Sequence, residues 1–349
     1  MKNNVQKKKM KLWVKLTIIF SSIIVGFGVI LGSAIGYFRL PVGDYYGASE
    51  KAFKIPEISD GYVPQGMCYD EFYESFILSG YMKDGSVSPL YLVDKEGNEH
   101  KKVTLLNPDG TDYVGHGGGV DVWQDNIYLT DSDNHAIYVY SLLELIDAEE
   151  NAKLNCKGEL PLKVSEEDYL EPAFVTVTGN KLIIGEFYRE ESYPTPESHK
   201  ITTKAGDYNQ ALAIEYNLDL AYPLGVDTTP VKAYSLPDQV QGLEVYEGKI
   251  YLSTSWGLSF SYIYEYDQTS LQEQTEKVTL LGNELTVYAL DSASLTNTYK
   301  IAPMSEEMAF VDGKLYVNCE SASDKYIFGK FTGGKWIYKT DLSKLNSDK

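Results

Sequence analysis

Short apolar segments separated by tight polar turns recur along this chain. The segment QGLEVYEGKIYLSTS (residues 241–255) shows the pattern most clearly, because runs of β-branched and aromatic residues lie on both sides of a Glu247-Gly248 pair. Apolar runs around a glycine-containing turn are typical of a β-hairpin. The pattern therefore predicts two short antiparallel strands in this segment.

The same hairpin pattern occurs five times. The apolar residue that follows the Gln-Gly pair of this segment has equivalents along the chain, spaced by 53 to 68 residues: Met67, Val120, Val175, Leu243 and Met308. Repetition of a sheet-forming unit at such a period indicates a propeller or solenoid. We expect an all-β fold, a β-propeller with five blades around a central axis.

Four of the five units contain four predicted strands each. The predicted strands are 65–70, 75–80, 90–94 and 102–106; 119–123, 126–130, 136–141 and 154–160; 174–178, 181–187, 211–216 and 231–236; and 242–246, 249–254, 285–290 and 298–301. The fifth unit supplies only three, at 307–311, 314–319 and 336–341. We expect Ala52 to Ile58 to complete the fifth sheet beside the strand near Trp336, which would close the ring and remove its exposed edges.

The N-terminal segment differs in composition from the rest of the chain. Residues 1–15 contain six lysines, and residues 16–38 form a 23-residue run without charge, followed by Arg39. This run is long enough to cross a bilayer, and the lysines place the N-terminus in the cytoplasm. The predicted organisation is a cytoplasmic basic segment (1–15), a transmembrane signal anchor (16–38), a polar linker (39–51) and an extracellular propeller (52–345). A cleaved signal peptide is the alternative.

Charge narrows the range of partners. The chain has a net charge of −19, and its 50 acidic residues all follow the apolar run. Such a surface repels nucleic acid and suits an extracellular domain or one that attracts cations. Nucleic acid is therefore excluded as a partner.

The predicted loops differ between the two faces of the propeller. The turns between first and second strands are tight, whereas the loops between second and third strands are long: 81–89, 131–135, 189–210, 255–283 and 320–335. Long loops on one face of a rigid scaffold are typical of a binding surface. We expect function on this long-loop face.

Polar residues recur where the five innermost strands begin, at one end of the axial channel. These are Gln65, His116, Glu171, Gln241, Glu306 and Glu307. One interpretation is that they only bond the strand ends and hold water. The other is that they converge on a ligand. Glu171, Glu306 and Glu307 offer the hard oxygen atoms that Ca²⁺ prefers, and close carboxylates repel unless a cation or proton intervenes. Ca²⁺ is therefore a candidate cofactor.

Two further residues are candidates on the long-loop face. Arg189 ends a predicted strand of the third unit and could pair with the acidic ring. Trp256 begins the longest loop and suits stacking on a sugar or aromatic group, or a role as a lid over the core.

No recognisable catalytic set accompanies these residues. HGGG at 116–119 matches the oxyanion loop of some esterases, but the chain contains no GxSxG motif. The four histidines lack metal-ligand spacing, and neither a phosphate-binding GxxxxGK nor a CxxC motif is present.

Three segments carry a resemblance to known proteins. PQGMCYD (64–70), GHGGGVDV (115–122) and QGLEVY (241–246) resemble uncharacterised secreted or membrane-anchored β-propeller proteins of Gram-positive bacteria, over roughly residues 64–341. More distantly the chain is similar to the YVTN and quinoprotein-like propeller superfamily. The resemblance implies a propeller fold and an extracellular place, and supplies no reaction.

Three functions are consistent with these features. The first is a binding module for a carbohydrate, peptide or other component of the cell envelope, such as a protein. The second is a hydrolase or lyase acting on a polysaccharide or phosphoester through Glu171, Glu306 and Glu307, with Ca²⁺ as a cofactor. The third is a structural role in envelope assembly.

Overall fold

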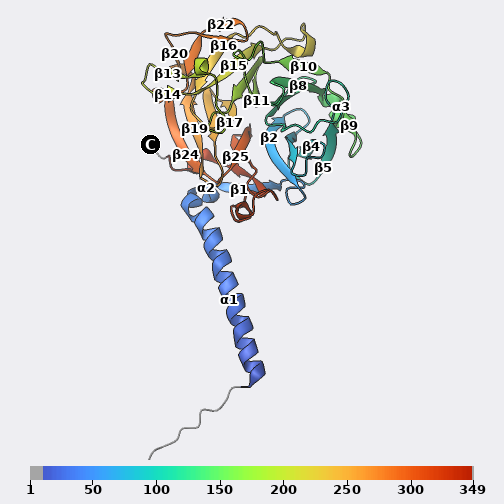
Figure 1. Cartoon of the computed structure of the whole chain (residues 1–349), viewed down its shortest axis with the longest axis vertical. Helices are drawn as coiled ribbons and strands as arrows, with labels where there is room; N and C mark the ends of the chain where they lie inside the picture. The colour runs from blue at the N-terminus through green and yellow to red at the C-terminus, as the bar shows by residue number, and fades with distance from the viewer. Residues whose placement is uncertain (1–10, 348–349) are drawn as a thin grey trace, which may run out of the picture.

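The computed structural model describes residues 11–347, and in this part of the chain five sheets of four to six strands surround a common axis (Figure 1). We number the sheets as blades 1 to 5 in chain order. Neighbouring innermost strands contact one another all the way around, and that of blade 5 contacts that of blade 1. The predicted all-β fold with five blades is confirmed.

The blades have the following strands, from the axis outward. Blade 1 contains β2 (Tyr62–Asp70), β3 (Ser75–Met82), β4 (Pro89–Asp94), β5 (His100–Leu105) and β9 (Lys153–Leu154). Blade 2 contains β6 (Val120–Trp123), β7 (Asn126–Asp131), β8 (Ala136–Ser141) and β10 (Gly158–Pro161). Blade 3 contains β11 (Pro172–Thr178), β12 (Lys181–Glu186), β15 (Ala211–Asn217), β16 (Lys232–Leu236), β23 (Val287–Ala289) and β20 (Gln272–Glu273). Blade 4 contains β17 (Val240–Tyr246), β18 (Lys249–Thr254), β19 (Ser261–Asp267) and β24 (Leu295–Ile301). Blade 5 contains β25 (Ser305–Val311), β26 (Lys314–Cys319), β27 (Trp336–Thr340) and β1 (Ser49–Lys54).

The remaining elements are short, apart from α1. Two small hairpins pair β13 (Ile201–Thr202) with β14 (Tyr208–Asn209) and β21 (Val278–Leu280) with β22 (Asn283–Leu285). The α-helices are α1 (Leu12–Arg39), α2 (Gly43–Gly47) and α3 (Leu142–Asp147). The 3-10 helices are η1 (Leu40–Val42), η2 (Glu197–His199), η3 (Pro223–Gly225), η4 (Gln268–Ser270), η5 (Phe328–Phe331) and η6 (Leu342–Lys344).

Packing between blades explains the abundance of aromatic residues. The second strand of each blade is buried along most of its length, because the neighbouring blades cover both of its faces. Aromatic side chains fill the gaps between blades. Phe76 of blade 1 lies 5.0 Å from Tyr316 of blade 5, and Tyr246 of blade 4 stacks on Phe310 of blade 5 at 4.3 Å, measured between ring centroids. Such contacts join sheets that share no ladder of hydrogen bonds.

The two ends of the propeller lie in one sheet. β1 pairs antiparallel with β27, with Phe53 opposite Ile337 and Lys54 opposite Trp336. The strand begins three residues earlier than the expected Ala52 and ends before Pro56, whose ring lacks the N–H that a ladder needs. Ile55 and Ile58, which were expected in the strand, are instead buried in the turn that leads to blade 1.

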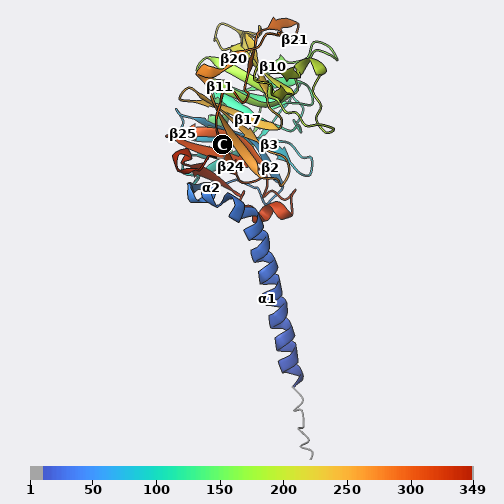
Figure 2. The same cartoon turned by 90° about the vertical axis from the view of Figure 1, so that its left-hand side faces the viewer.

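The N-terminal helix leaves the propeller at blade 5 (Figures 1 and 2). α1 is long and apolar enough to cross a membrane, and a signal sequence would have the same features. Residues 1–10 of the predicted basic segment lie outside the described residues. Residues 39–51, expected as a polar linker, instead form η1, α2 and the start of β1. Val42 and Tyr45 are buried against blades 4 and 5, and Tyr45 lies 6.0 Å from Tyr338, ring to ring.

Two predicted strands were misplaced. The third strand of blade 4 is β19, not 285–290. β19 contains the Tyr-rich run SYIYEYD, whose residues are largely alternately buried and half-buried, and it lies in a stretch that was expected to be a loop. The expected strand at 285–290 contributes β23, which pairs in parallel with β16 at the edge of blade 3. Likewise, 154–160 divides between β9 on blade 1 and β10 on blade 2.

The packing of residues 39–51 leads to a stability prediction. Tyr45→Ala in the full chain should lower the free energy of unfolding by about 3–5 kcal/mol, because it empties a buried aromatic site. Tyr45→Phe keeps the ring and should cost far less. Urea denaturation of both variants in detergent micelles measures the difference. Equal stability of the two would show that this segment is only a tether.

Candidate functional site

A cavity of about 790 Å³ opens at the end of the axis where the innermost strands begin. The chain approaches this axial cavity in the same way in all five blades. In each blade, the residue two positions before the aligned apolar residue of the repeat lines the cavity. These residues are Gln65, Gly118, Ala173, Gln241 and Glu306. In four blades the pairing of the first two strands is irregular at this point. Such bulges re-aim side chains next to functional sites.

The next position in each blade forms a second layer below the cavity. Its residues are Gly66, Gly119, Phe174, Gly242 and Glu307. The glycines allow a close approach at the axis. A Cβ atom on Gly119 would lie 2.5 Å from Glu307 Oε1, and one on Gly66 would lie 2.7 Å from the backbone nitrogen of Val120. The HGGG sequence therefore serves axial packing, since no larger residue fits beside Glu307.

Glu307 joins three blades through its side chain. Its Oε2 accepts hydrogen bonds from the backbone N–H groups of Met67 on β2 and Val120 on β6, both at 3.0 Å. Its Oε1 accepts a hydrogen bond from the N–H of Val175 on β11 at 3.2 Å. Burial raises the pKa of Glu307 well above its usual range, although these hydrogen bonds oppose the rise. The carboxyl group is thus committed to the propeller itself.

Glu306 has the opposite environment. Its side chain is only 4% exposed, it makes no side-chain hydrogen bond within residues 11–347, and its carboxyl oxygens open into the cavity. Burial raises the pKa of Glu306 well above its usual range, and the charges of Glu320 and Glu307 raise it further, while Lys325 opposes. A buried carboxyl group without a partner is costly unless a proton or a ligand compensates it.

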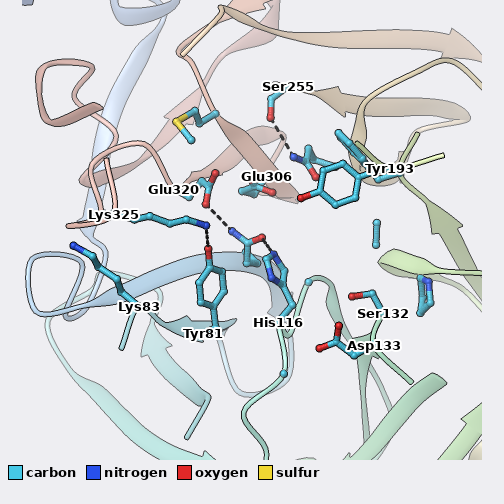
Figure 3. Close-up of a pocket in the computed structure, with 18 of the residues that line it drawn as sticks. Tyr81, Lys83, His116, Ser132, Asp133, Tyr193, Ser255, Glu306, Glu320 and Lys325 are labelled. Carbon is cyan, nitrogen blue, oxygen red and sulfur yellow. Dashed lines mark hydrogen bonds between the residues drawn. The ribbon is translucent and has the colours of Figure 1, made fainter. Parts of the chain in front are cut away.

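Glu320 lies beside Glu306 and is well supported (Figure 3). Its Oε1 accepts a hydrogen bond from Tyr326 Oη at 2.9 Å, and its Oε2 accepts one from Gln65 Nε2 at 3.1 Å. The Gln65 side chain continues to His116, with 2.6 Å between Oε1 and Nε2. This geometry makes His116 Nε2 the donor, because the Gln65 oxygen can only accept. Burial raises the pKa of Glu320 as well, opposed first by the bond from Tyr326.

Aromatic and basic groups surround these acids. The Tyr81 ring lies 4.5 Å from that of His116, centroid to centroid, and Lys325 Nζ donates a hydrogen bond to Tyr81 Oη. Desolvation and the charge of Lys325 lower the pKa of His116, although its side chain is exposed to the cavity. The charge of Asp133 opposes this shift.

An aromatic wall lies across the cavity from Lys325 (Figure 3). It consists of Phe187, Tyr193 and Trp256, whose ring centroids lie 5.4 to 6.1 Å apart. Arg189 does not line the cavity. Its guanidinium covers the Trp256 ring at 4.0 Å and donates a hydrogen bond to Ser192 Oγ at 2.7 Å. The expected pairing of Arg189 with the acidic ring is therefore wrong.

The structure brings together six of the eight predicted site residues. Those lining the cavity are Gln65, His116, Glu171, Gln241, Trp256 and Glu306. Glu307 lies below it, bound to backbone N–H groups, so it cannot share a Ca²⁺ ion with Glu171 and Glu306 in the expected way. Within residues 11–347, no three His, Cys, Asp or Glu side chains form a group that could hold a metal ion.

Sequence reasoning missed the residues that follow the second strands. Ser132, Phe187, Ser255 and Glu320 each come directly after β7, β12, β18 or β26 and line the cavity. Their shared position was a usable signal, because the second strand of each blade runs toward the long-loop face. Lys325 and Tyr326 lie in the long loop after β26, and Tyr81 lies near the end of β3, at a position that was expected to begin a loop.

The fold and cavity define a five-bladed β-propeller with an acidic, aromatic-lined axial site. The structure is similar to the crystal structure of Myxococcus xanthus glutaminyl cyclase, with 12% sequence identity and a TM-score of 0.41, over 83% of this chain and 92% of that chain. It is also similar to a crystal structure of a nidogen–laminin complex, with 10% identity and a TM-score of 0.39, over 74% of this chain and 73% of that one. These likenesses concern the fold alone. No protein-family model and no curated protein matches the chain.

The adjacent glutamates should respond differently to substitution. Glu307→Ala leaves three buried N–H groups without an acceptor, each costing about 1–3 kcal/mol, so unfolding should become easier by at least about 3 kcal/mol. Glu306→Gln should not destabilise the protein, because it replaces a buried acid that makes no hydrogen bond to the described residues with a neutral side chain of the same shape. Urea denaturation at pH 7 compares the two. Equal loss in both variants would refute the separate roles.

Proposed function

We propose that this protein binds a small, donor-rich polar group in its axial cavity, namely the protonated amine of an envelope amino sugar or peptide. Glu306 carries the proposal, because its buried carboxyl group lines the cavity without a partner among the described residues. An ammonium group would supply both the charge and the hydrogen bonds that Glu306 lacks.

The rest of the lining suits the same ligand. Glu171 and Asp133 add acidic groups to the cavity. The wall of Phe187, Tyr193 and Trp256 offers an apolar surface against which a sugar ring or side chain can pack. A cavity that combines apolar walls with a few convergent polar groups is typical of ligand sites.

The proposal includes a location. We take α1 as a membrane anchor that holds the propeller outside the cell, where envelope carbohydrate and peptide are available. The apolar length of α1 and the lysines that precede it support this orientation. The resemblance to membrane-anchored propellers of Gram-positive bacteria is consistent with it.

Binding should depend on a free amine and on pH. Four probes test this by isothermal titration calorimetry on the full chain in detergent: glucosamine, triglycine and their N-acetylated forms. At least one free amine should bind at pH 8, and its acetylated form should bind at least about tenfold more weakly, since a charged hydrogen bond contributes about 1.5–3 kcal/mol.

The pH dependence follows from the raised pKa of Glu306. The carboxyl group must be ionised and the amine protonated for this pairing, so affinity should rise with pH, by up to about tenfold per unit, while Glu306 loses its proton. Affinity should fall again where the amine of the probe is deprotonated, at about pH 8 for an α-amino group. Glu306→Gln should weaken binding and remove this dependence. Glu99→Gln, which neutralises an exposed carboxyl group outside the cavity, is the control. Equal affinity for acetylated probes would refute the proposal.

Hydrolysis is a second candidate, favoured by the pairing of Glu306 with Glu320. Two neighbouring carboxyl groups in different environments are typical of an acid and its partner in glycoside chemistry. Glu320 has two side-chain donors, whereas Glu306 has none among the described residues.

A substrate panel separates this candidate from binding alone. Polysaccharides and phosphodiesters are incubated with the wild type, Glu306→Gln and Glu320→Gln. A hydrolase should lose at least about 10²-fold in rate in either variant. Equal turnover by all three proteins would remove both glutamates from the mechanism, and no turnover by the wild type would support binding alone.

A further inference from the structure

Apolar side chains are exposed where α1 meets the propeller. Tyr37 and Leu40 at the end of the helix are exposed, and so are Ile327 (76%) and Phe328 (65%) in the loop between β26 and β27. Large exposed apolar side chains gathered in one place indicate an interaction surface. We call these four residues the α1–η5 surface.

The two halves of the surface are fixed to each other. η5 packs against the end of α1, and Arg39 Nε donates a hydrogen bond to the carbonyl oxygen of Phe331 at 3.2 Å. Tyr46 Oη donates another to the carbonyl oxygen of Thr332. The loop therefore cannot shift along the helix without breaking these bonds.

The level of this surface follows from the length of α1. Its uncharged run, residues 16–38, spans about 35 Å at 1.5 Å per residue, and the hydrocarbon core of a bilayer is about 30 Å thick. If α1 spans the membrane, Tyr37 and Leu40 lie at its outer boundary. η5 begins at Phe328 and packs against the end of α1, so Ile327 and Phe328 are expected at the same boundary.

The charges around the surface fit lipid headgroups. Lys330 lies in the same loop as Ile327 and Phe328, and Lys83 donates a hydrogen bond to that loop, in a chain whose net charge is −19. Asp324 is the acid among them: it pairs with Lys330, and its carbonyl oxygen accepts a hydrogen bond from Lys83 at 2.8 Å. Basic residues flanking an apolar pair are attracted to anionic membrane surfaces.

We propose that the loop between β26 and β27 is a second membrane contact, with Ile327 and Phe328 inserted into the outer leaflet of the bilayer that α1 spans. The proposal rests on the membrane location proposed above. Because Glu320, Lys325 and Tyr326 of the same loop line the axial cavity, one wall of the ligand site is held at the membrane surface. The cavity is thus placed to receive a group carried close to the bilayer.

Spin labelling of the full chain tests the insertion. Cys156→Ser leaves Cys68 and Cys319, which are buried, so a nitroxide can be attached at Ile327→Cys. Leu220→Cys is the matched control, because Leu220 is 69% exposed and lies between β15 and β16, on the blade far from α1 (Figure 1). In phosphatidylcholine–phosphatidylglycerol vesicles, the label is probed with lipid-soluble oxygen and a water-soluble nickel complex.

The ratio of oxygen to nickel accessibility should be several-fold higher at 327 than at 220. An equal ratio would overturn the inference, and so would an intact mass showing that the membrane-bound chain lacks α1. Replacing Phe328 with Asp should lower the ratio at 327, since it opposes insertion. Calorimetry with glucosamine and triglycine in detergent separates the membrane contact from the proposed ligand binding, because Ile327 does not line the cavity. If the insertion test fails while ligand binding is unchanged, only the membrane contact is rejected.

Discussion

The propeller depends on one buried carboxyl group at its axis. Five sheets that share no ladder of hydrogen bonds must be held together where they converge, and Glu307 of blade 5 accepts backbone N–H groups from blades 1, 2 and 3 there. Gly119 and Gly242 leave the space that its side chain fills. Removing a carboxyl group from water is costly, and three directed donors offset that cost only if all three strands are in place. The bond set therefore favours the closed ring over any partial assembly.

The same axial geometry gives two adjacent residues opposite roles. Successive residues of a strand point in different directions, and the irregular pairing at Ser305 to Met308 turns Glu306 toward the cavity while Glu307 faces the strands below it. Glu307 is satisfied by the fold, whereas Glu306 is left for a proton or a ligand. A site formed in this way needs no catalytic motif in the sequence, because the raised pKa of Glu306 arises from its buried position rather than from a short run of particular residues.

Local patterns predicted the fold better than the site. The five hairpins, the number of blades and six of the cavity residues follow from short-range alternation and glycine turns, which depend on neighbouring residues. The role of Glu307 could not be predicted, because its donors lie 132 to 240 residues away in the chain. β19 was missed because its tyrosines lie in a polar stretch, and β23 because it pairs with the edge of another blade. Pairing between distant segments is not encoded in a local alternation.

Blade 5 connects the anchor, the ring and the cavity. It contains both ends of the propeller in β1 and β27, it packs against Tyr45 beyond α1, and it supplies Glu306, Glu307 and Glu320. The segment after α1 and the acidic residues of the cavity are therefore joined through one hydrogen-bonded sheet. Strands within a blade share a hydrogen-bonded ladder, whereas blades contact one another through side-chain packing. The position of the acidic site relative to α1 is thus determined by the blade that builds it.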